Sequence, residues 1–451
     1  MKGKIIITAF LLITILQTST SLTIPDADAP MSLDIEEDIY RKLEDQDLFR
    51  EGKTKIALVS DVHHYAPSLY DPASPGFQEF SQNNEGRTVL YTTEMMNILK
   101  TDLLSRGITT LLISGDLSVL GARETHEDMA LILEGFESSG IEVFITPGNH
   151  DINNPRAFRI IGAGTERVES VDPQEFRDIY EDFGFNEAVL TDPGGLSYLA
   201  RLETGLYLLS LDSCSYERNE DRGYSVSGGF FRPGQYDFAG KAIDLAQKGG
   251  GKVIVMTHHN FLEHYEIDHD LTNFMINDEK RMLNLLMDRG VKIALSGHIH
   301  KSDIKRHERG SDSFYGIATG SLQIYPHSYR LIGRDSNELL VSTADLKENM
   351  IRDGHRDILN YNRNIGLSRS FSKRYESLLK DTPEAEARLM AEYFYLVNLY
   401  AQQGLEASLP DSVLHSGGLE LLEASGGRMS GFARSLPLDS YPDDRNARIP
   451  W

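Results

Sequence analysis

Residues 144–151, with the sequence FITPGNHD, join a short apolar run to a polar cluster that begins after a Pro-Gly pair. The apolar run ends at Thr146, and Asn149, His150 and Asp151 then bring an amide, an imidazole and a carboxylate. Strands of open α/β sheets present their chemistry at their carboxyl ends. One such ending is also typical of an ordinary polar loop, so its meaning depends on how the other strands end.

Six apolar runs of strand length organise the middle of the chain. Between them, apolar residues recur at helical spacing over residues 88–105, 124–139, 235–247 and 279–289. This alternation indicates a layered α/β domain with parallel strands. The six predicted strands are residues 55–60, 110–114, 142–146, 206–211, 252–257 and 291–296.

The pattern changes between the third and fourth runs and again after the last one. Residues 152–200 read as an insertion with a helix near 173–183, and beyond about residue 350 the pattern is helical. We expect one catalytic domain over residues 55–350 and a C-terminal helical region over 351–451, with a loosely ordered tail from residue 425. Shorter β-like runs of more antiparallel character lie at 313–319, 322–331 and 338–345.

The composition limits the classes of partner. The chain of 451 residues has 68 acidic and 45 basic residues and a net charge of −23. Nucleic acids are bound through Lys and Arg patches, so neither nucleic acid nor an anionic membrane is the expected partner. The 40% hydrophobic and 25% charged contents are those of an ordinary globular protein.

The N-terminus predicts export. Lys2 and Lys4 precede an apolar stretch at residues 5–16, and small residues follow at 19–21, which is the pattern of a signal peptide over residues 1–21. An uncleaved N-terminal anchor is the alternative. Residues 22–54 read as a polar linker with a short helix. No later segment has transmembrane length, so we expect a secreted or extracytoplasmic protein without a membrane span in its mature chain.

Five of the strand ends carry side chains that bind metals. Cys214 is the only cysteine, so a metal here needs carboxylate, amide and imidazole ligands. Each ending has an ordinary explanation by itself, but five in one domain point to a shared site. The residues are Asp61 with His63, Asp116, Asn149 with His150, His258, and His298 with His300.

These ligand types suit divalent Mn, Fe or Zn, and a carboxylate can bridge two ions. Two such ions activate a water and hold the attacking and leaving oxygens of an in-line displacement. Together with two carboxylates and a hydroxide they carry a net charge of about +1. The centre can therefore attract a phosphate within an acidic protein.

The order of these blocks resembles the calcineurin-like metallophosphoesterase family, whose pattern is D-x-H, GD, GNH(D/E), H and GHxH. The resemblance covers roughly residues 55–325 and implies a four-layer α/β/β/α sandwich with two mixed sheets, to which the C-terminal helical extension is added. The blocks are residues 61–63, 115–116, 148–151, 258 and 297–300.

The resemblance also implies roles for the site residues. Asp61, His63 and His300 are expected to hold one metal ion, and Asn149, His258 and His298 the other, with Asp116 between them. His150 is expected to protonate the leaving oxygen or to steady the phosphoryl group, and the first of these roles is general-acid catalysis. We expect Asp151 to orient His150, on adjacency alone. His259 remains an alternative to His258, because Asn260 stands where many family members have Pro.

The expected function is an exported phosphoric ester hydrolase with two divalent metal ions. A hydroxide generated at the metals attacks the phosphorus of a small phosphomonoester or phosphodiester in line. One alternative is another dinuclear metallohydrolase, such as an amidase or peptidase. The other is a binding protein of the cell envelope without catalytic activity. The expected insertion and the loops at 215–235 and 260–278 are the candidates for shaping the substrate pocket.

Overall fold

The computed structural model describes residues 54–83, 87, 89–265, 274–335, 337–346, 371–426, 429–437 and 444–450. They belong to one compact unit, Leu48–Trp451. The predicted signal peptide, and the predicted linker up to residue 53, lie outside the described residues, so both stay predictions. Among the described helices, none combines the length and the apolarity needed to cross a bilayer.

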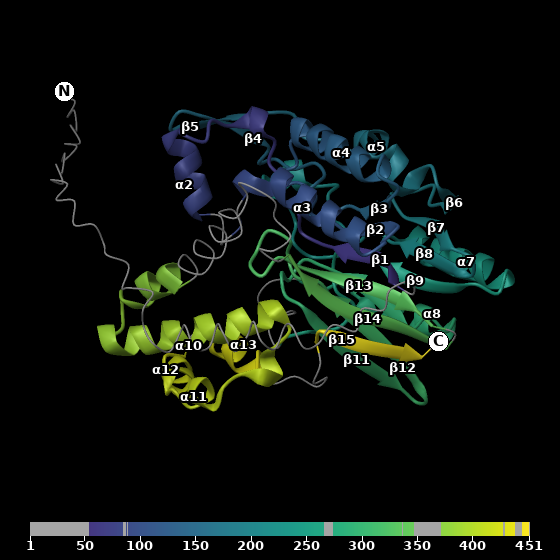
Figure 1. The fold of residues 1–451 in the computed structure, drawn as a ribbon. Coiled ribbons are helices and arrows are strands. Elements are labelled where there is room, and N and C mark those ends of the chain that lie inside the picture. Colours follow the sequence, from purple (N-terminus) through teal and green to yellow (C-terminus); the bar gives the residue numbers. More distant parts are fainter. Residues whose placement is uncertain are drawn as a thin grey trace, which may run out of the picture. The chain divides into compact units, whose positions relative to one another are not determined.

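The first sheet has six strands and mixed direction (Figure 1). Its order is β15-β14-β13-β1-β2-β3, in which β1, β2 and β3 are parallel. The remaining neighbouring pairs, β1 with β13, β13 with β14 and β14 with β15, are antiparallel. The strands are β1 Thr54–Val59, β2 Thr110–Ser114, β3 Glu142–Thr146, β13 Ser328–Arg334, β14 Glu338–Asp345 and β15 Asn446–Pro450.

The second sheet has seven strands in the order β11-β12-β10-β9-β8-β7-β6. Its four central strands, β12, β10, β9 and β8, are parallel, and the strands at both edges are antiparallel to their neighbours. The strands are β6 Ala188–Thr191, β7 Tyr198–Glu203, β8 Leu206–Ser210, β9 Lys252–Met256, β10 Ile293–Ser296, β11 Asp303–Arg309 and β12 Asp312–Ala318.

Helices cover the outer face of each sheet, which gives the predicted α/β/β/α sandwich. Helices α3 Thr92–Ser105 and α4 Arg123–Glu137 pack on the first sheet, and α7 Pro233–Lys248 and α8 Glu279–Asp288 on the second (Figure 1). Smaller helices and turns complete the domain: η1 Pro67–Leu69, α2 Pro75–Asn83, η2 Val89–Tyr91, α5 Pro173–Ile179, η3 Glu181–Phe185 and α6 Asn219–Arg222.

The side chains of a single strand show how the layers form. Along β9, Val253 and Val255 belong to the cluster beneath α7 and α8, whereas Ile254 and Met256 belong to the core that includes the first sheet. Successive side chains of a strand point to opposite faces, so a strand that is buried on both faces is apolar throughout. The continuous apolar runs in the sequence are therefore the central strands.

Three parts of the fold differ from the sequence expectation. In the expected run 322–331 the strand begins only at Ser328, and the loop before it is held next to the end of β1 by a hydrogen bond from Leu322 N to the Ser60 carbonyl oxygen. The predicted insertion contains strands as well as a helix, including the hairpin of β4 Phe158–Ile161 and β5 Gly164–Arg167. All four residues of β5 are exposed, so no apolar alternation marks this strand.

The third difference is the tail, which is not loosely ordered throughout. Strand β15 pairs with β14 and so returns the chain to the first sheet. Arg330 is fully buried and donates a hydrogen bond to the carbonyl oxygen of Asp444 at 2.6 Å, just before β15. The helices ahead of it are α10 Glu384–Gln403, η5 Glu406–Ser408, α11 Asp411–Leu414, α12 Gly418–Ala424 and α13 Met429–Ser435.

Candidate metal centre

The two sheets bring the predicted ligands together at the carboxyl ends of their parallel strands. The first sheet supplies Asp61, Asp116 and Asn149 after β1, β2 and β3, and the second supplies His258 and His298 after β9 and β10. Parallel strands of one sheet end at the same edge, which is why residues far apart in sequence meet there.

One group of ligands consists of Asp61, His63 and His300. Their side-chain oxygen and nitrogen atoms lie close enough to share one metal ion. Asp61 Oδ1 is 3.2 Å from His300 Nε2 and 3.8 Å from His63 Nε2. The two imidazole Nε2 atoms are 3.2 Å apart. This is the set that the sequence predicts for the first metal.

The second group gathers around His258. Its Nε2 atom lies 3.0 Å from Asn149 Oδ1 and 3.5 Å from Asp116 Oδ2, and its ring centroid lies 4.7 Å from that of His298. Asp116 Oδ2 is also 3.6 Å from His63 Nε2 in the first group. Asp116 therefore lies between the two groups, as a bridging carboxylate would.

The backbone has an unusual conformation at five of the seven ligand positions. Five of the site residues adopt a positive φ, a conformation that costs a non-glycine residue on the order of 1 kcal/mol. Such outliers persist only where the surrounding structure holds them, and they cluster at functional sites. The φ values are 52° for Asp61, 44° for His63, 50° for Asp116, 71° for His298 and 56° for His300.

Close packing of loops adds a second constraint. A Cβ atom at Gly148 would overlap the backbone nitrogen of Asp116, and one at Gly297 would overlap Ser60 Oγ. Any larger residue would push the ligand loops apart. Gly148 therefore lets the loops after β2 and β3 of the first sheet approach each other, and Gly297 lets the loop after β10 of the second sheet approach the end of β1.

Buried atoms without partners show that the site fits a cation. Asp61 Oδ1 and His298 Nε2 are both buried and have no hydrogen bond within the described part of the chain. An unpaired buried polar atom costs about 1–3 kcal/mol, which a bound metal would relieve. Carboxylate and imidazole are also the ligands that Mn, Fe and Zn accept.

The pKa values of the imidazoles point the same way. Burial, and then His259, hold the pKa of His298 well below its usual value, so its ring is neutral as a ligand requires. Burial alone would lower the pKa of His258, but the Asp116 carboxylate raises it to about 9. Without a metal, a proton on His258 thus compensates the negative charge of Asp116, and a divalent ion can replace that proton.

The hydrogen bonds of the two neighbouring imidazoles favour His258 over His259 as a ligand. His258 Nδ1 lies 2.9 Å from the Ser114 carbonyl oxygen, which can only accept, so Nδ1 carries a hydrogen, and in the neutral ring the Nε2 lone pair faces the site. Both ring nitrogens of His259 have protein partners instead, Ser213 Oγ at 2.8 Å and the Ser227 carbonyl oxygen at 2.9 Å. His259 lies near enough to join the group, but its nitrogens are already engaged.

His150 lies at the edge of the centre. Its Nδ1 donates a hydrogen bond to the Val119 carbonyl oxygen at 2.7 Å, which leaves Nε2 facing Asp116 Oδ2 at 3.9 Å. The His150 side chain is 31% exposed and that of His300 19%, whereas His63 and His258 are fully buried. The centre is therefore open to solvent on the side of His150 and His300.

The structure corrects the expectation for Asp151. Its carboxylate accepts hydrogen bonds from the backbone N–H groups of Leu117, Ser118 and Gly148 and from Ser118 Oγ. The backbone carbonyl of Val119, rather than Asp151, orients the His150 ring. Burial, and then the Asp116 carboxylate, raise the pKa of Asp151 to about 7. Asp151 therefore ties the loop after β3 to the loop after β2.

The sequence reasoning missed several contributors. Arg87 donates a hydrogen bond to His63 Nε2 at 3.1 Å, and Ser321 Oγ donates one to the Asp61 carbonyl oxygen at 2.8 Å. His298 N donates to Asp61 Oδ2 at 2.9 Å. No motif marks Arg87 or Ser321, since a single arginine or serine in a loop has no distinctive spacing.

Other polar residues near the strand ends are engaged elsewhere. His64 Nε2 lies 2.6 Å from Asp128 Oδ2 on α4, and His264 Nδ1 lies 2.9 Å from Asp303 Oδ1. Asp212 accepts a hydrogen bond from the Tyr216 hydroxyl at 2.7 Å. His269, which falls in the predicted pocket loop 260–278, lies outside the described residues.

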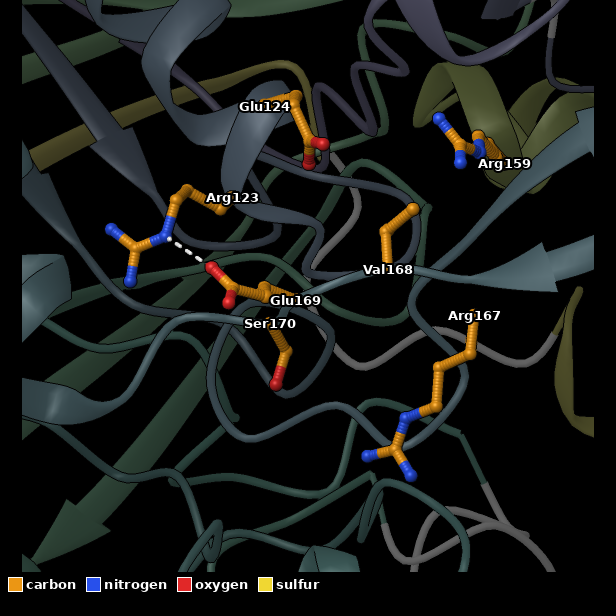
Figure 2. Close-up of a pocket in the computed structure, with 7 residues that line it drawn as sticks. All are labelled: Arg123, Glu124, Arg159, Arg167, Val168, Glu169 and Ser170. Atoms are coloured by element: carbon orange, nitrogen blue, oxygen red, sulfur yellow. Dashed lines mark ion pairs between the residues drawn. The ribbon is translucent and has the colours of Figure 1, made fainter.

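A surface pocket of about 580 Å³ lies at the start of α4 and beside the β4–β5 hairpin (Figure 2). None of its lining residues belongs to the ligand groups. Its arginines are paired with acids, because Arg123 lies 3.4 Å from Glu169, Arg159 2.9 Å from Glu166 and Arg167 2.6 Å from Glu220. The lining residues are Arg123, Glu124, Arg159, Arg167, Val168, Glu169 and Ser170.

Two solved structures illustrate the range of similar folds. A dimetal phosphatase from Danio rerio shares 11% identity with a TM-score of 0.46, over 65% of this chain and 97% of that chain. A purple acid phosphatase from yellow lupin shares 11% identity with a TM-score of 0.43, over 66% of this chain and 52% of that chain.

No curated protein matches the sequence. The family model for calcineurin-like phosphoesterases matches residues 54–302, more than half of the chain. This range contains both ligand groups and all five motif blocks. The chain therefore belongs to the calcineurin-like phosphoesterase family.

Proposed function

We propose that this protein is an exported hydrolase of small phosphomonoesters or phosphodiesters that uses two divalent metal ions. The observation that carries the proposal is the meeting of the predicted ligands from five strand ends around Asp116. Asp61, His63 and His300 would hold one ion, and Asn149, His258 and His298 the other. The ions would supply an activated water and would stabilise the charge that develops on phosphorus.

The chain's own residues position the substrate side of the reaction. His150 lies on the open side of the centre, and the Val119 carbonyl fixes its ring so that Nε2 faces the cluster. A protonated His150 Nε2 can pass its proton to the leaving oxygen. General-acid catalysis of this kind typically raises the rate about 10²–10⁴-fold. The Asp151 carboxylate holds the loop after β2 and the loop after β3 together.

The test is a panel of aryl phosphate monoesters and diesters, given to the full mature chain reconstituted with Mn²⁺, Fe²⁺ or Zn²⁺. We expect metal-dependent turnover of at least one ester class. Turnover of an amide or a peptide in the absence of any phosphoester hydrolysis would favour the amidase alternative. Full metal binding without any turnover would favour a binding protein.

Export is a proposal that the N-terminal sequence supports. Lys2, Lys4 and the apolar stretch at residues 5–16 form the pattern of a signal peptide. N-terminal sequencing of the protein recovered outside the cytoplasm should give a start near residue 22. A start at Met1 in a membrane fraction would instead indicate an uncleaved anchor.

A further inference from the structure

The segment 214–219, which follows β8 of the second sheet, contacts the loop after β3 of the first sheet that carries His150. We call residues 147–153 the His150 loop. Contacts ahead of His150 and after it hold the loop on both sides of the imidazole. They are Cys214 Sγ with the Pro147 carbonyl oxygen at 3.3 Å, Asn219 Nδ2 with the Ile152 carbonyl oxygen at 3.3 Å, and Asn153 Nδ2 with the Tyr216 carbonyl oxygen at 3.4 Å.

The amide of Asn219 is bound at both of its ends. Its side chain is buried, and its Oδ1 atom accepts a hydrogen bond from Val226 N at 3.1 Å. The other end must therefore be the NH₂ group, which donates to the Ile152 carbonyl oxygen. An amide that is fixed at both ends sets the distance between the segment 214–219 and the His150 loop.

A buried ion pair holds the segment 214–219 itself. Asp212 Oδ2 lies 3.3 Å from Arg232 Nη1, and the two side chains are 0% and 19% exposed. Asp212 also accepts hydrogen bonds from Cys214 N at 2.9 Å and from the Tyr216 hydroxyl at 2.7 Å. Apolar replacements of such a pair are often neutral or stabilising, so the pair is weak evidence for stability. Its directional hydrogen bonds favour a role in fixing the geometry of the segment.

The opposite side of the His150 loop is held by the loop after β2. Asp151 accepts a hydrogen bond from Ser118 N at 2.8 Å, and His150 Nδ1 donates one to the Val119 carbonyl oxygen at 2.7 Å. His150 is thus held between the loop after β2 and the segment 214–219. A displacement of about 1 Å in a reacting group can cost about 10²-fold in rate.

We propose that the segment 214–219 is a positioning element that fixes the His150 loop for proton transfer to the leaving oxygen, an inference that rests on the proposed phosphoesterase function. Such a transfer requires the donor within about 2.6–3.2 Å of the oxygen. Asn219 and the Asp212–Arg232 pair act through the loop, so they are positioning residues. Their loss impairs esters whose leaving group needs a proton and spares esters whose leaving group departs as an anion.

The test uses the full mature chain and three variants. Asn219→Asp keeps the acceptor for Val226 N but cannot donate to the His150 loop. Asn153→Gly removes the contact with Tyr216 without strain, because Asn153 has a φ of 47°. Arg232→Met breaks the buried ion pair. The matched controls are two exposed sites.

The controls are Asn186→Asp and Arg289→Met, whose native side chains contact Asp182 and Asp244.

Two measurements separate positioning from general support of the fold. The first is the ratio of kcat/KM for 4-nitrophenyl phosphate to kcat/KM for benzyl phosphate in the Mn²⁺-loaded protein, or for their methyl diesters if wild type hydrolyses only diesters. These leaving groups are similar in size, but only the benzyl alcohol needs a proton to leave. The second is backbone hydrogen exchange over residues 147–153 in the metal-free protein, which does not depend on turnover.

We expect each of the three variants to lower kcat/KM for the benzyl ester roughly 10-fold, a fraction of the about 10²–10⁴-fold that general-acid catalysis supplies. The 4-nitrophenyl ester should change little. Exchange over residues 147–153 should be faster, because the loop opens more often. The two controls should change neither measurement.

An unchanged ratio between the two esters in Asn219→Asp and Asn153→Gly would overturn the proposal, because a segment that only supports the fold lowers both rates together. Unchanged exchange over residues 147–153 in these variants would overturn it as well. In either case, hydrolysis by wild type leaves the proposed function standing. If the loaded wild type hydrolyses no ester, the proposed function fails with it.

Discussion

Asp116 joins the two ligand groups at the scale of single residues. Its Oδ2 atom lies 3.5 Å from His258 Nε2 and 3.6 Å from His63 Nε2. Burial alone would raise the pKa of Asp116, but His258 and His150 beside it hold that pKa well below its usual range. The carboxylate is thus ionised, as a bridging ligand must be. Its Oδ1 atom also accepts a hydrogen bond from His150 N at 2.9 Å, so one residue links metal holding to proton transfer.

His150→Ala should separate catalysis from metal binding. We expect the variant to keep its metal content, because His150 belongs to neither ligand group, and to lose about 10²–10⁴-fold in turnover. Elemental analysis and steady-state kinetics measure the two effects. The control is His415→Ala, an exposed histidine whose Nδ1 lies 2.9 Å from the Asp411 carbonyl oxygen one helical turn earlier. Loss of metal together with turnover would mean that His150 is itself a ligand.

The pair His258→Asn and His259→Asn tests which imidazole binds the metal. His258→Asn should lose tight binding of one ion, because the Nε2 atom that faces Asn149 and Asp116 is gone. His259→Asn should keep both ions at saturating metal, since its ring nitrogens serve Ser213 and Ser227. The reverse pattern in a metal titration would assign the ligand to His259.

At the scale of elements, the sequence predicted the strands that are buried on both faces and the polar residues that end them. The run at residues 110–114 matches β2 at both ends, because five buried residues in a row leave no ambiguity. Short or exposed strands such as β5 and β15 were missed, since their stability comes from partners far away in sequence. The same holds for Asp151 and Arg87, whose contacts depend on how the loops meet rather than on local pattern.

The C-terminal segment also supports the metal loops. Tyr265, in the loop after His259, donates a hydrogen bond to Glu406 Oε1 at 3.2 Å, and Lys301, next to His300, lies 5.0 Å from the Phe432 ring. Ile304 N donates to Asp444 Oδ1 at 2.7 Å. The helical region therefore contacts both loops from the second sheet that carry ligands, and Asp444, just before β15, contacts the start of β11.

Asp444→Ala should destabilise the protein by about 1–3 kcal/mol, the cost of leaving the buried Ile304 N–H without an acceptor. Urea unfolding measures the change. The control is Arg448→Ala in β15, which removes an exposed ion pair with Glu338 and should cost about 0–1 kcal/mol. Equal, small effects from both variants would mean that Asp444 does not anchor the segment.

At the scale of the whole molecule, buried imidazoles set the response to acid. Burial lowers the pKa of His126 and of His327 to about 4, and that of His259 to about 3. An unfolded histidine binds a proton near pH 6.5. Between these values the unfolded chain binds more protons, so stability falls as the pH drops. Asp151, with a pKa of about 7, acts in the opposite direction but is outnumbered.

The metal-free protein should therefore lose stability as the pH is lowered from about 6.5 to about 4, by on the order of 3 kcal/mol for His126. His126→Gln keeps a donor and an acceptor for Tyr180 and the Asp151 carbonyl but cannot take up the proton. The stability advantage of wild type over this variant should thus shrink as the pH falls. A difference that is independent of pH would contradict the assignment.

The central claim is a centre for two metal ions that depends on Asp116, and metal counting tests it most directly. The full mature chain is reconstituted with Mn²⁺, freed of loosely bound ions, and analysed for metal per chain beside Asp116→Asn. The account predicts two ions in wild type and at least one fewer in the variant, since the bridging carboxylate is lost. One ion or none in wild type, or equal content in both proteins, would contradict it.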